Sequence, residues 1–442
     1  MGDLTDRLKY VGRRATPYAL AIALGLAAFY LFTRKDEDSI YIDVPQQTLE
    51  RSSDDAGYGK KEVVPLVRKE DPVDSGADSE NVNKTIDDKV DGVSWIGGVK
   101  DGWQGGKAPS SAEDNRGFGT PSCVSVDRYG NLYVVDEDHH RISRWDSSGN
   151  AQGWVGSGNS GWQMDGKSVS GKGYQSFDSP CGVAVGRYGD FYIVDSNNNR
   201  VCKCDSLGNV VGWIGGGSDG WKTTKAPACS SDARSFDVPL GICLDNQENI
   251  YVADTSNSRI CKWSSSGNFI GWIGGGKDGW QTDEGGMGGM DYQSFMFPQG
   301  VCVDNNGDIY VADFSNHRIC NWDSSGKAKG WIGGGKDGWQ KGEAPASEGS
   351  DYRSFNLPRG VCVYGVYIYV ADTKNHRISR WNVLGRAMGW IGGGYEDWQK
   401  GSGASSGTGS LSFNEPSSVF VIPGGVIYVA DSKNRRVFQR QD

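Results

Sequence analysis

The chain has 442 residues and a formal net charge of −9 at neutral pH. Nucleic-acid binding needs a basic face that neutralises phosphates, so this acidic balance excludes nucleic acid from the expected partners. The 66 glycines and 16 tryptophans, set against only 14 prolines, favour short strands and tight turns over collagen or helical bundles.

The N-terminal region predicts a membrane anchor. Residues 1–14 form a short tail, and residues 15–33, ATPYALAIALGLAAFYLFT, are uncharged over nearly the ~20 residues that a spanning helix needs. Arg13 and Arg14 precede this stretch, while the basic pair behind it is followed at once by three acidic residues, so the positive-inside rule slightly favours a cytoplasmic N-terminus and a non-cytoplasmic remainder. The alternative is a cleaved signal peptide, for which GLAA offers small residues at a cleavage site. Because the apolar run continues to Phe32, an uncleaved single-pass anchor is favoured.

Residues 34–92 predict a flexible acidic linker. Between residues 36 and 92 there are sixteen acidic and seven basic side chains and few aromatic ones. Such a composition does not bury enough apolar surface to offset the entropy lost on ordering. The linker would let a folded domain stand clear of the bilayer.

From residue 93 onward the sequence repeats every 59 residues. The segment GWIGGGKDGWQ at 271–281 recurs unchanged at 330–340. Within one unit, four short apolar or β-branched runs are separated by turns rich in Gly, Asn and Ser, which predicts one four-stranded antiparallel blade of a β-propeller. The tryptophan that opens each WIGG-type segment shows the period throughout, at Trp95, Trp154, Trp213, Trp272, Trp331 and Trp390.

The two ends of the repeat region predict how the propeller closes. The first WIGG strand, residues 95–98, precedes any complete unit, and the last unit stops at Asp442 without such a strand. We therefore expect residues 93–442 to form an all-β, six-bladed propeller of four-stranded antiparallel blades, in which the N-terminal strand completes the last blade. The single transmembrane helix and the disordered acidic linker would precede it.

The repeats resemble a known family. YVADFSNHRI (310–319) and YVADTKNHRI (369–378), each after a P-x-G-V-C-V strand, are similar to the NHL repeat, which is named for its Asn-His-Leu. The resemblance covers residues 93–442 and implies a six-bladed propeller, in agreement with the number of units. The first copy departs from the pattern with His139 in place of Asn, the fifth has a shorter first turn, and each unit is longer than is usual for the family.

Two charged residues recur in every copy and are expected to be structural. An Asp at the end of the second strand can cap the following turn, and an Arg five residues later can pair with it across the hairpin. Sixfold repetition favours architecture, because a catalytic site needs one particular arrangement of groups. The aspartates are Asp136, Asp195, Asp254, Asp313, Asp372 and Asp431, and the arginines are Arg141, Arg200, Arg259, Arg318, Arg377 and Arg436.

No catalytic residue, metal site or cofactor is expected. The resemblance brings a zinc lyase of the amidating type into consideration, but there are only four histidines, and the positions of His140, His317 and His376 hold other residue types in the remaining copies. The ten cysteines include one set on the first strand and one on the third, which lie too far apart for a disulfide within a blade. We expect them to be small buried side chains.

The long inserts between each WIGG strand and the next blade carry the candidate binding residues. We expect these inserts to form loops that crown the face with the turns between second and third strands. In one interpretation the Asp of the D-G-W motif makes a turn and the Trp fills the seam between blades; in the other, an acidic, aromatic crown docks a protein, glycan or cation. The residues are Asp101, Trp103, Trp162, Asp219, Trp221, Asp278, Trp280, Asp337, Trp339, Glu396 and Trp398.

The expected function is that of a membrane-anchored, non-enzymatic interaction or scaffold module. Its partner would be a protein or a membrane complex, with a glycan or extracellular polymer as a further class. Two alternatives stay open: a propeller hydrolase or lyase with an axial metal, and an accessory structural subunit of a larger membrane complex.

Overall fold

The computed structural model describes residues 92–98, 100–107, 116–283, 285–286, 288–343 and 348–442. The chain divides into two units, Met1–Asn81 and Val82–Asp442, and all described residues lie in the second. The predicted tail (1–14), the predicted transmembrane helix (15–33) and all but the last residue of the predicted linker (34–92) lie outside the described residues. In the part that the structure describes, no helix is long and apolar enough to cross a membrane.

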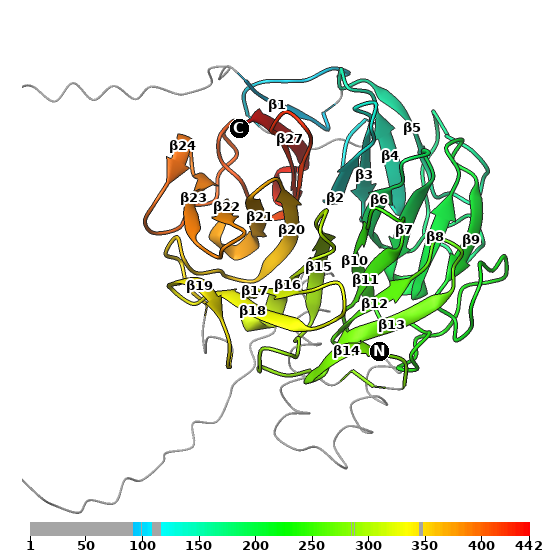
Figure 1. Cartoon of the computed structure of the whole chain (residues 1–442). Helices are drawn as coiled ribbons and strands as arrows, with labels where there is room; N and C mark the ends of the chain where they lie inside the picture. Colours follow the sequence, from blue (N-terminus) through cyan, green and yellow to red (C-terminus); the bar gives the residue numbers. More distant parts are fainter. Residues whose placement is uncertain (1–91, 99, 108–115, 284, 287, 344–347) are drawn as a thin grey trace, which may run out of the picture. The chain divides into compact units, whose positions relative to one another are not determined.

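The described residues form six antiparallel sheets arranged as the blades of a propeller (Figure 1). Blades are numbered along the chain by their innermost strand. Blade 1 contains β2 (Pro121–Val126), β3 (Leu132–Asp136), β4 (Arg141–Trp145) and β5 (Ala151–Val155). Blade 2 contains β6 (Pro180–Val185), β7 (Phe191–Asp195), β8 (Arg200–Cys204) and β9 (Val210–Ile214). Blade 3 contains β10 (Pro239–Leu244), β11 (Ile250–Asp254), β12 (Arg259–Trp263), β13 (Phe269–Gly274) and β14 (Lys277–Gln281).

The remaining three blades repeat this order. Blade 4 contains β15 (Pro298–Val303), β16 (Ile309–Asp313), β17 (Arg318–Trp322), β18 (Ala328–Gly333) and β19 (Lys336–Gln340). Blade 5 contains β20 (Pro358–Tyr364), β21 (Tyr367–Asp372), β22 (Arg377–Asn382), β23 (Ala387–Gly392) and β24 (Tyr395–Gln399). Blade 6 contains β25 (Pro416–Val421), β26 (Val426–Asp431), β27 (Arg436–Gln441) and β1 (Val93–Ile96).

The ring closes as the sequence predicts. Strand β1 pairs antiparallel with β27, with Val93 opposite Arg440 and Trp95 opposite Phe438. The innermost strands contact one another in succession from β2 to β25, and β25 contacts β2 again. A strand from the start of the repeat region therefore joins the last blade by backbone hydrogen bonds, and the predicted six-bladed propeller with this closure is confirmed.

The prediction of four strands per blade is wrong for blades 3, 4 and 5, which have five. Their extra strands, β14, β19 and β24, contain the D-G-W or equivalent segment and pair with the fourth strand. Consecutive glycines with positive φ, such as Gly274 (φ 116°), Gly275 (φ 70°) and Gly276 (φ 80°), allow the chain to reverse tightly there. The other blades make an isolated bridge at the same place, as between Trp154 and Gln163.

Glycines allow the innermost strands to approach closely around the axis. A Cβ atom on Gly241 would lie 2.1 Å from the carbonyl oxygen of Gln299 in the next blade, and one on Gly300 would lie 2.4 Å from that of Arg359. Both distances are far below van der Waals contact, so a larger residue would force the two blades apart. At these two seams ring packing therefore requires the glycine of the P-x-G segment, whereas blades 1 and 6 have Cys123 and Ser418 at the equivalent position.

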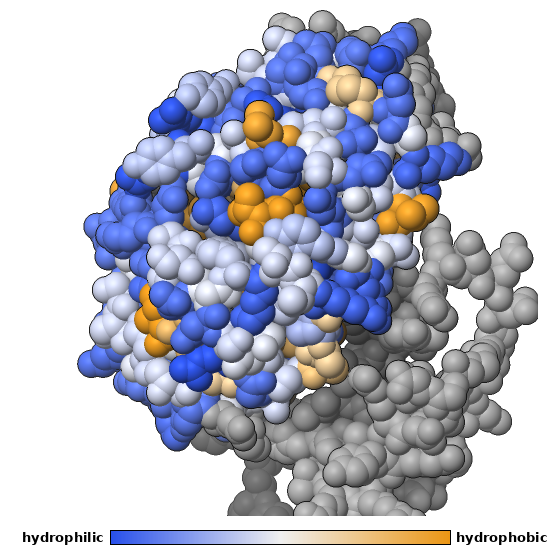
Figure 2. Space-filling view, turned by 90° about the vertical axis from the view of Figure 1, so that its right-hand side faces the viewer, coloured by the Kyte–Doolittle hydropathy of each residue, from blue (hydrophilic) through white to orange (hydrophobic). Residues whose placement is uncertain are grey.

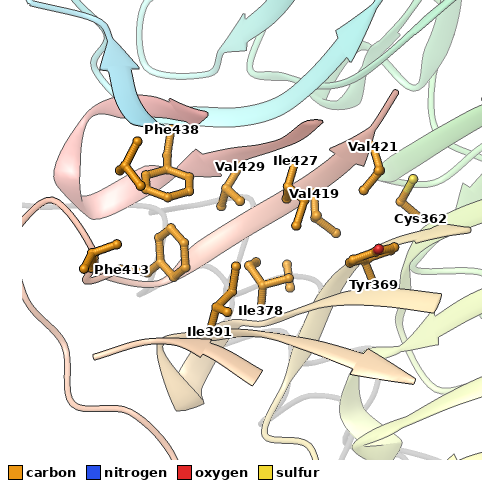
Figure 3. Close-up of a cluster of buried hydrophobic side chains, with 13 residues drawn as sticks. Cys362, Tyr369, Ile378, Ile391, Phe413, Val419, Val421, Ile427, Val429 and Phe438 are labelled. Atoms are coloured by element: carbon orange, nitrogen blue, oxygen red, sulfur yellow. The ribbon is translucent and has the colours of Figure 1, made fainter. Parts of the chain in front are cut away.

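The hydrophobic core lies between blades. Figure 3 shows one cluster, in which side chains of blade 5 such as Ile378 and Ile391 face side chains of blade 6 such as Val429 and Phe438. Val93 of β1 belongs to the same cluster. Equivalent clusters fill the other seams, so each sheet buries its faces only against its neighbours.

Candidate functional site

Each blade contains a buried clamp built on the recurrent Asp and Arg. In blade 3, Asp254 Oδ2 accepts hydrogen bonds from Arg259 Nε at 2.8 Å and from Asn257 Nδ2 at 2.9 Å, and Asp254 Oδ1 accepts the N–H of Asp237 at 2.8 Å. Neither Asp254 nor Arg259 has any exposed surface. The Asp–Arg pair recurs in the other five blades at 2.7 to 3.2 Å.

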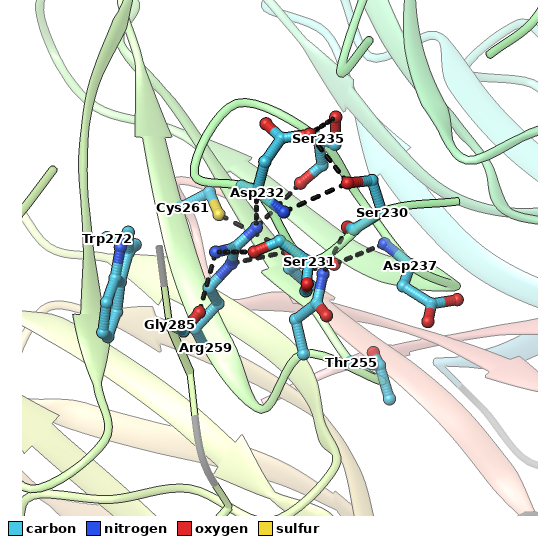
Figure 4. A network of polar contacts seen from close by, with 12 residues as sticks. Ser230, Ser231, Asp232, Ser235, Asp237, Thr255, Arg259, Cys261, Trp272 and Gly285 are labelled. Carbon is cyan, nitrogen blue, oxygen red and sulfur yellow. Dashed lines mark hydrogen bonds and ion pairs between the residues drawn. The ribbon is translucent and has the colours of Figure 1, made fainter. Parts of the chain in front are cut away.

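The arginine of the clamp also holds the insert that leads into its blade. Figure 4 shows Arg259 among backbone carbonyls of this insert: Nη2 donates to the oxygens of Asp232 at 2.7 Å and Ser235 at 2.8 Å. Nη1 donates to the carbonyl of Gly285, in the insert that leaves the blade, at 2.9 Å. The guanidinium thus fixes an irregular segment that has few backbone partners of its own. Sequence reasoning predicted the ion pair but not this second role.

Burial disfavours the charged form of the clamp carboxylates. It raises the pKa of Asp254 to about 6, against the lowering effect of the Arg259 charge and of three hydrogen bonds. The pKa of Asp195 is raised to about 6 for the same reason. Both carboxylates are therefore ionised at neutral pH, but only because their hydrogen-bond partners stay in place.

The D-G-W residues lie along the outer rim of the propeller, where they connect neighbouring blades. Strands β14, β19 and β24 are the outermost of their sheets (Figure 1). Trp280 Nε1 donates to the carbonyl of Ser324 at 3.1 Å, and Asp278 Oδ1 accepts the N–H of Ala328 at 3.0 Å. Ser324 lies in the turn between the third and fourth strands of blade 4, and Ala328 directly follows this turn. The D-G-W part of the insert therefore lies along the rim, because it pairs with the fourth strand. Another part of the insert, residues 230–235, contacts Asn257 and Arg259 at the turn between the second and third strands of blade 3.

The same rim contacts recur in the other seams. The indole N–H of each remaining tryptophan donates a hydrogen bond to the following blade. These residues are Trp103, Trp162, Trp221, Trp339 and Trp398. The remaining aspartates that accept a backbone N–H there are Asp101, Asp219 and Asp337, while Glu396 is exposed. Each tryptophan stays half-buried, so a binding role for this set remains a prediction beside its contacts between blades.

The histidines also tie neighbouring blades together. His140 Nδ1 accepts the N–H of Ser179 at 3.0 Å, and His317 and His376 do the same for the next blade at 3.2 Å. His139 takes the place of the clamp Asn in blade 1, with its Nδ1 2.7 Å from Asp136 Oδ2. Within the described ranges, no three or more His, Cys, Asp or Glu side chains are placed to hold a metal ion.

All ten cysteines are free, and two of them meet across a seam. Cys302 of β15 receives the N–H of Val363 at 3.3 Å and a hydrogen bond from the thiol of Cys362, which together lower the pKa of Cys302. The spacing of cysteines within one blade does not reveal this contact, because equivalent positions of adjacent innermost strands meet only where the blades pack around the axis.

A ring of residues surrounds the axis where the innermost strands begin. We call it the axial ring. It consists of the residue after each clamp Asp and the second residue of each innermost strand: Glu137, Ser196, Thr255, Phe314, Thr373 and Ser432, with Ser122, Cys181, Leu240, Gln299, Arg359 and Ser417.

The axial ring departs from the repeat at two opposite seams. In four blades the hydroxyl after the clamp Asp donates to the carbonyl of the proline that starts the next innermost strand, at 2.6 to 2.8 Å. Glu137 in blade 1 and Phe314 in blade 4 replace these hydroxyls. The seam after blade 1 and the seam after blade 4 face each other across a six-membered ring.

The two exceptional seams are linked electrostatically. The guanidinium of Arg359 lies 5.9 Å from the centre of the Phe314 ring. Burial raises the pKa of Glu137 to about 7, and the positive charges of Arg359 and Lys433 partly offset this effect. The carboxylate therefore lies within electrostatic reach of Arg359, although no ion pair or hydrogen bond to its oxygens is formed by the described residues. The sequence contains a signal for this part of the axial ring, because Glu137 and Phe314 replace a residue that is Ser or Thr in the other four repeats. The repeat pattern does not show that the two positions lie at opposite seams.

Glu137 should make stability depend on pH in a way that Glu137→Gln removes. Because its pKa is raised in the folded state, the folded protein binds a proton more readily than the unfolded chain, so this contribution to stability is present at low pH and is lost as the pH rises through about 7. Relative to the variant, the wild type should lose roughly 2–3 kcal/mol of unfolding free energy between about pH 5 and pH 8. Urea unfolding of both proteins at the two pH values measures this difference. If the difference in unfolding free energy between the two proteins is the same at both pH values, the raised pKa of Glu137 is contradicted.

The fold and its clamps define the class of the protein: a six-bladed β-propeller whose blades are each closed by a buried Asp–Arg pair. The model of the NHL repeat matches residues 236–263 and 295–320, which lead into and form parts of blades 3 and 4. These two segments therefore match the NHL repeat, which the sequence resemblance also indicated.

Three curated relatives show the same kind of similarity. The chain is 25% identical to NHL repeat-containing protein 2 of Gallus gallus over 58% of this chain and 46% of that protein. It is 33% identical to the Homo sapiens protein of that name over 25% of this chain and 14% of that one. It is 27% identical to the probable peptidyl-alpha-hydroxyglycine alpha-amidating lyase pgal-1 of Caenorhabditis elegans over 32% and 36% of the two chains. These matches span less than half the length of each relative.

Solved structures show similarity to the chain at low sequence identity. A catalytically inactive virginiamycin B lyase from Staphylococcus aureus has a TM-score of 0.44 and 11% identity, with 75% of this chain and 82% of that chain covered. An auxiliary nutrient binding protein from Bacteroides thetaiotaomicron has a TM-score of 0.48 and 14% identity, with 78% and 75% covered.

Proposed function

We propose that the chain is a membrane-anchored, non-enzymatic β-propeller that binds a protein partner. The apolar stretch at 15–33 would supply the anchor, and the acidic linker at 34–92 would hold the propeller away from the bilayer, on the non-cytoplasmic side. The observation that carries the binding role is a group of exposed large side chains on blades 1 and 2.

Among the described residues, six of the eleven exposed large hydrophobic side chains lie on blades 1 and 2 or on the insert between them. The most exposed of these six are Tyr129 (68%), Tyr188 (76%) and Leu207 (69%), in turns at the end of the blades away from the axial ring. Figure 2 views the molecule from the right of Figure 1, where the outer strands of these blades lie, and shows several small, separate groups of hydrophobic side chains on a mostly hydrophilic surface. A concentration of exposed large side chains on two neighbouring blades is typical of an interaction surface.

The turns that carry these residues are held in place. Tyr129 and Tyr188 occupy equivalent turns of adjacent blades, and Arg128 lies 4.7 Å from the centre of the Tyr129 ring. Arg187 beside Tyr188 lies 3.7 Å from Glu248 in the corresponding turn of blade 3. Tyrosine and arginine on rigid turns lose little conformational entropy on binding and are enriched in interface hot spots.

The test compares partner recovery between surface variants of the full-length chain. The triple variant carries Tyr129→Ser, Tyr188→Ser and Leu207→Ser. We expect it to recover at least about tenfold less of the protein that co-purifies with the detergent-solubilised wild type, because hot-spot residues each contribute about 2 kcal/mol or more. The matched control is Leu384→Ser with Tyr395→Ser, two exposed residues of blade 5, which should retain the partner. Equal recovery by both variants would contradict the proposal.

Other outcomes of the same purification would favour the alternatives. A metal bound in stoichiometric amount to the purified chain would contradict the non-enzymatic proposal and favour a lyase or hydrolase, a class to which the similarity to pgal-1 also points. A large, fixed detergent-solubilised mass that the triple variant does not reduce would favour an accessory subunit of a membrane complex. Recovery of a glycan or polymer in place of a protein would change the class of partner.

A further inference from the structure

Cys302 and Cys362 occupy the same position on adjacent innermost strands, β15 of blade 4 and β20 of blade 5. The two backbones approach closely there. A Cβ atom on Gly300, two residues before Cys302, would lie 3.2 Å from the α-carbon of Gly360, two residues before Cys362. Since a Cα–Cβ bond is about 1.5 Å long, the α-carbons of these glycines lie within about 5 Å of each other. A disulfide needs α-carbons about 4.4 to 6.8 Å apart, so the strands run at a spacing that suits one.

The sulfur atoms of the pair meet in the seam between the two blades. Sγ of Cys302 accepts the N–H of Val363 at 3.3 Å, and this nitrogen is only two bonds from the α-carbon of Cys362. The thiol of Cys362 donates a further hydrogen bond to the same sulfur. The two thiols are therefore neighbours in the fold, although they are a whole repeat apart in the sequence.

The contact distinguishes this pair from the other thiols. Cys243 of blade 3 has the equivalent position, but burial and the charge of Cys302 raise its pKa without any hydrogen bond between these two thiols among the described residues. In blades 1, 2 and 6 the position holds Ser125, Ala184 and Phe420. Cys302 and Cys362 are thus the pair that the ring brings into direct contact.

The two thiols differ in acidity and in access. The hydrogen bond from the Cys362 thiol and the N–H of Val363 lower the pKa of Cys302, although burial acts in the opposite direction. The same thiol hydrogen bond, together with burial, raises the pKa of Cys362 well above its ordinary value. Cys302 is partly exposed, whereas only 7% of the surface of Cys362 is exposed. Because the thiolate is the reactive form, Cys302 is suited to be the nucleophile and Cys362 to be its protonated neighbour.

We propose that Cys302 and Cys362 form a redox-active dithiol, which hydrogen peroxide oxidises to a disulfide across the seam between blades 4 and 5. The Cys302 thiolate attacks one peroxide oxygen, so that an S–O bond forms, the O–O bond breaks and hydroxide leaves. The Cys362 sulfur then attacks the sulfur of this sulfenic acid. The S–S bond forms, the S–O bond breaks, and the hydroxyl leaves as water with the proton of the Cys362 thiol. In total the dithiol gives up two electrons and two protons, and the peroxide becomes two molecules of water.

The first experiment maps oxidation in the detergent-solubilised full-length chain. The reduced protein is treated briefly with hydrogen peroxide, the remaining thiols are blocked with iodoacetamide, and linked peptides are identified by mass spectrometry. We expect the Cys302–Cys362 linkage to form at least about tenfold faster than any other oxidation among the ten cysteines, and dithiothreitol to reverse it. If this linkage does not form, or if other cysteines are oxidised at the same rate, the proposal is overturned.

Single substitutions separate the roles of the two thiols. Cys362→Ser should leave Cys302 as a sulfenic acid that dimedone traps, because no second thiol is there to condense with it. Cys302→Ser should leave Cys362 at least about tenfold less reactive than Cys302 is in the wild type. Cys243→Ser, at the equivalent position of blade 3, is the matched control and should form the disulfide at the wild-type rate. Loss of the linkage in Cys243→Ser, or rapid oxidation of Cys362 in Cys302→Ser, would contradict the assigned roles.

Competitive alkylation tests the acidity of Cys302 without any substitution. In the folded, reduced wild type at neutral pH, Cys302 should react with iodoacetamide at least about tenfold faster than Cys243, because a larger fraction of it is thiolate. Equal rates for the two residues would remove the basis for Cys302 as the nucleophile.

Unfolding measurements test whether the native spacing accepts the bond. The disulfide would close a loop of one complete repeat and so reduce the entropy of the unfolded chain. The oxidised wild type should therefore unfold at a higher urea concentration than the reduced protein, whereas peroxide should not shift Cys302→Ser. A lower midpoint for the fully linked protein would count against the proposal. The Tyr129/Tyr188/Leu207 variant should form the disulfide normally, which separates failure of this site from failure of the proposed protein surface.

Discussion

Asp254→Ala is expected to lower the free energy of unfolding by about 3–5 kcal/mol, because it leaves the Arg259 guanidinium buried without its counter-charge. The N–H of Asp237 and the amide of Asn257 lose their acceptor at the same time. The effect should spread to the insert, since the carbonyls of Asp232 and Ser235 are held by the same guanidinium. Denaturant unfolding measures the loss, and hydrogen exchange should show faster exchange in residues 230–237.

The control is an ion pair of an aspartate with a lysine at the surface. Asp308 pairs with Lys329, whose side chain is 45% exposed, and Asp308→Ala should cost less than about 1 kcal/mol. Comparable losses for the two variants would mean that the clamp does not depend on burial. A small loss for Asp254→Ala would mean that Arg259 finds another partner.

Removal of β1 is expected to have the largest effect of all. Deletion of Val93–Ile96 takes three buried side chains out of the core and leaves β27 with an unpaired edge. At about 1.5–3 kcal/mol for each buried side chain, the loss should be roughly 5–8 kcal/mol, a large part of the stability of an ordinary domain. The measurement is denaturant unfolding of the deletion variant beside the wild type, with the unfolding midpoint and slope compared.

A point variant isolates the packing contribution of this strand. Ile96 has no exposed surface, and Ile96→Ala should cost about 2–5 kcal/mol. Ile270→Ala on β13, where the side chain is 38% exposed, should cost well under that, within about 1 kcal/mol. If the deletion and Ile96→Ala leave stability unchanged, then β1 does not close the ring in solution.

The sequence by itself determined the architecture of the propeller. The 59-residue period, the alternation of apolar runs with turns, and the complementary ends of the repeat region predicted both six blades and the pairing of β1 with β27. These features are local or periodic, because strand and turn preferences act over a few residues and each repeat states them again. The paired Asp254 and Arg259 were predictable for the same reason, since only five residues separate them.

The tertiary structure decided where the inserts go and what surrounds the axis. Trp280 contacts a turn 44 residues further along the chain, and Cys302 meets Cys362 in another blade, so the pattern of a single repeat contains neither contact. Glu137 and Arg359 lie more than 200 positions apart in the sequence, and their charges influence each other only because six sheets stand in a closed ring. Repetition fixes what each blade contains, whereas ring closure alone determines which exceptional residues of different blades face the same axis.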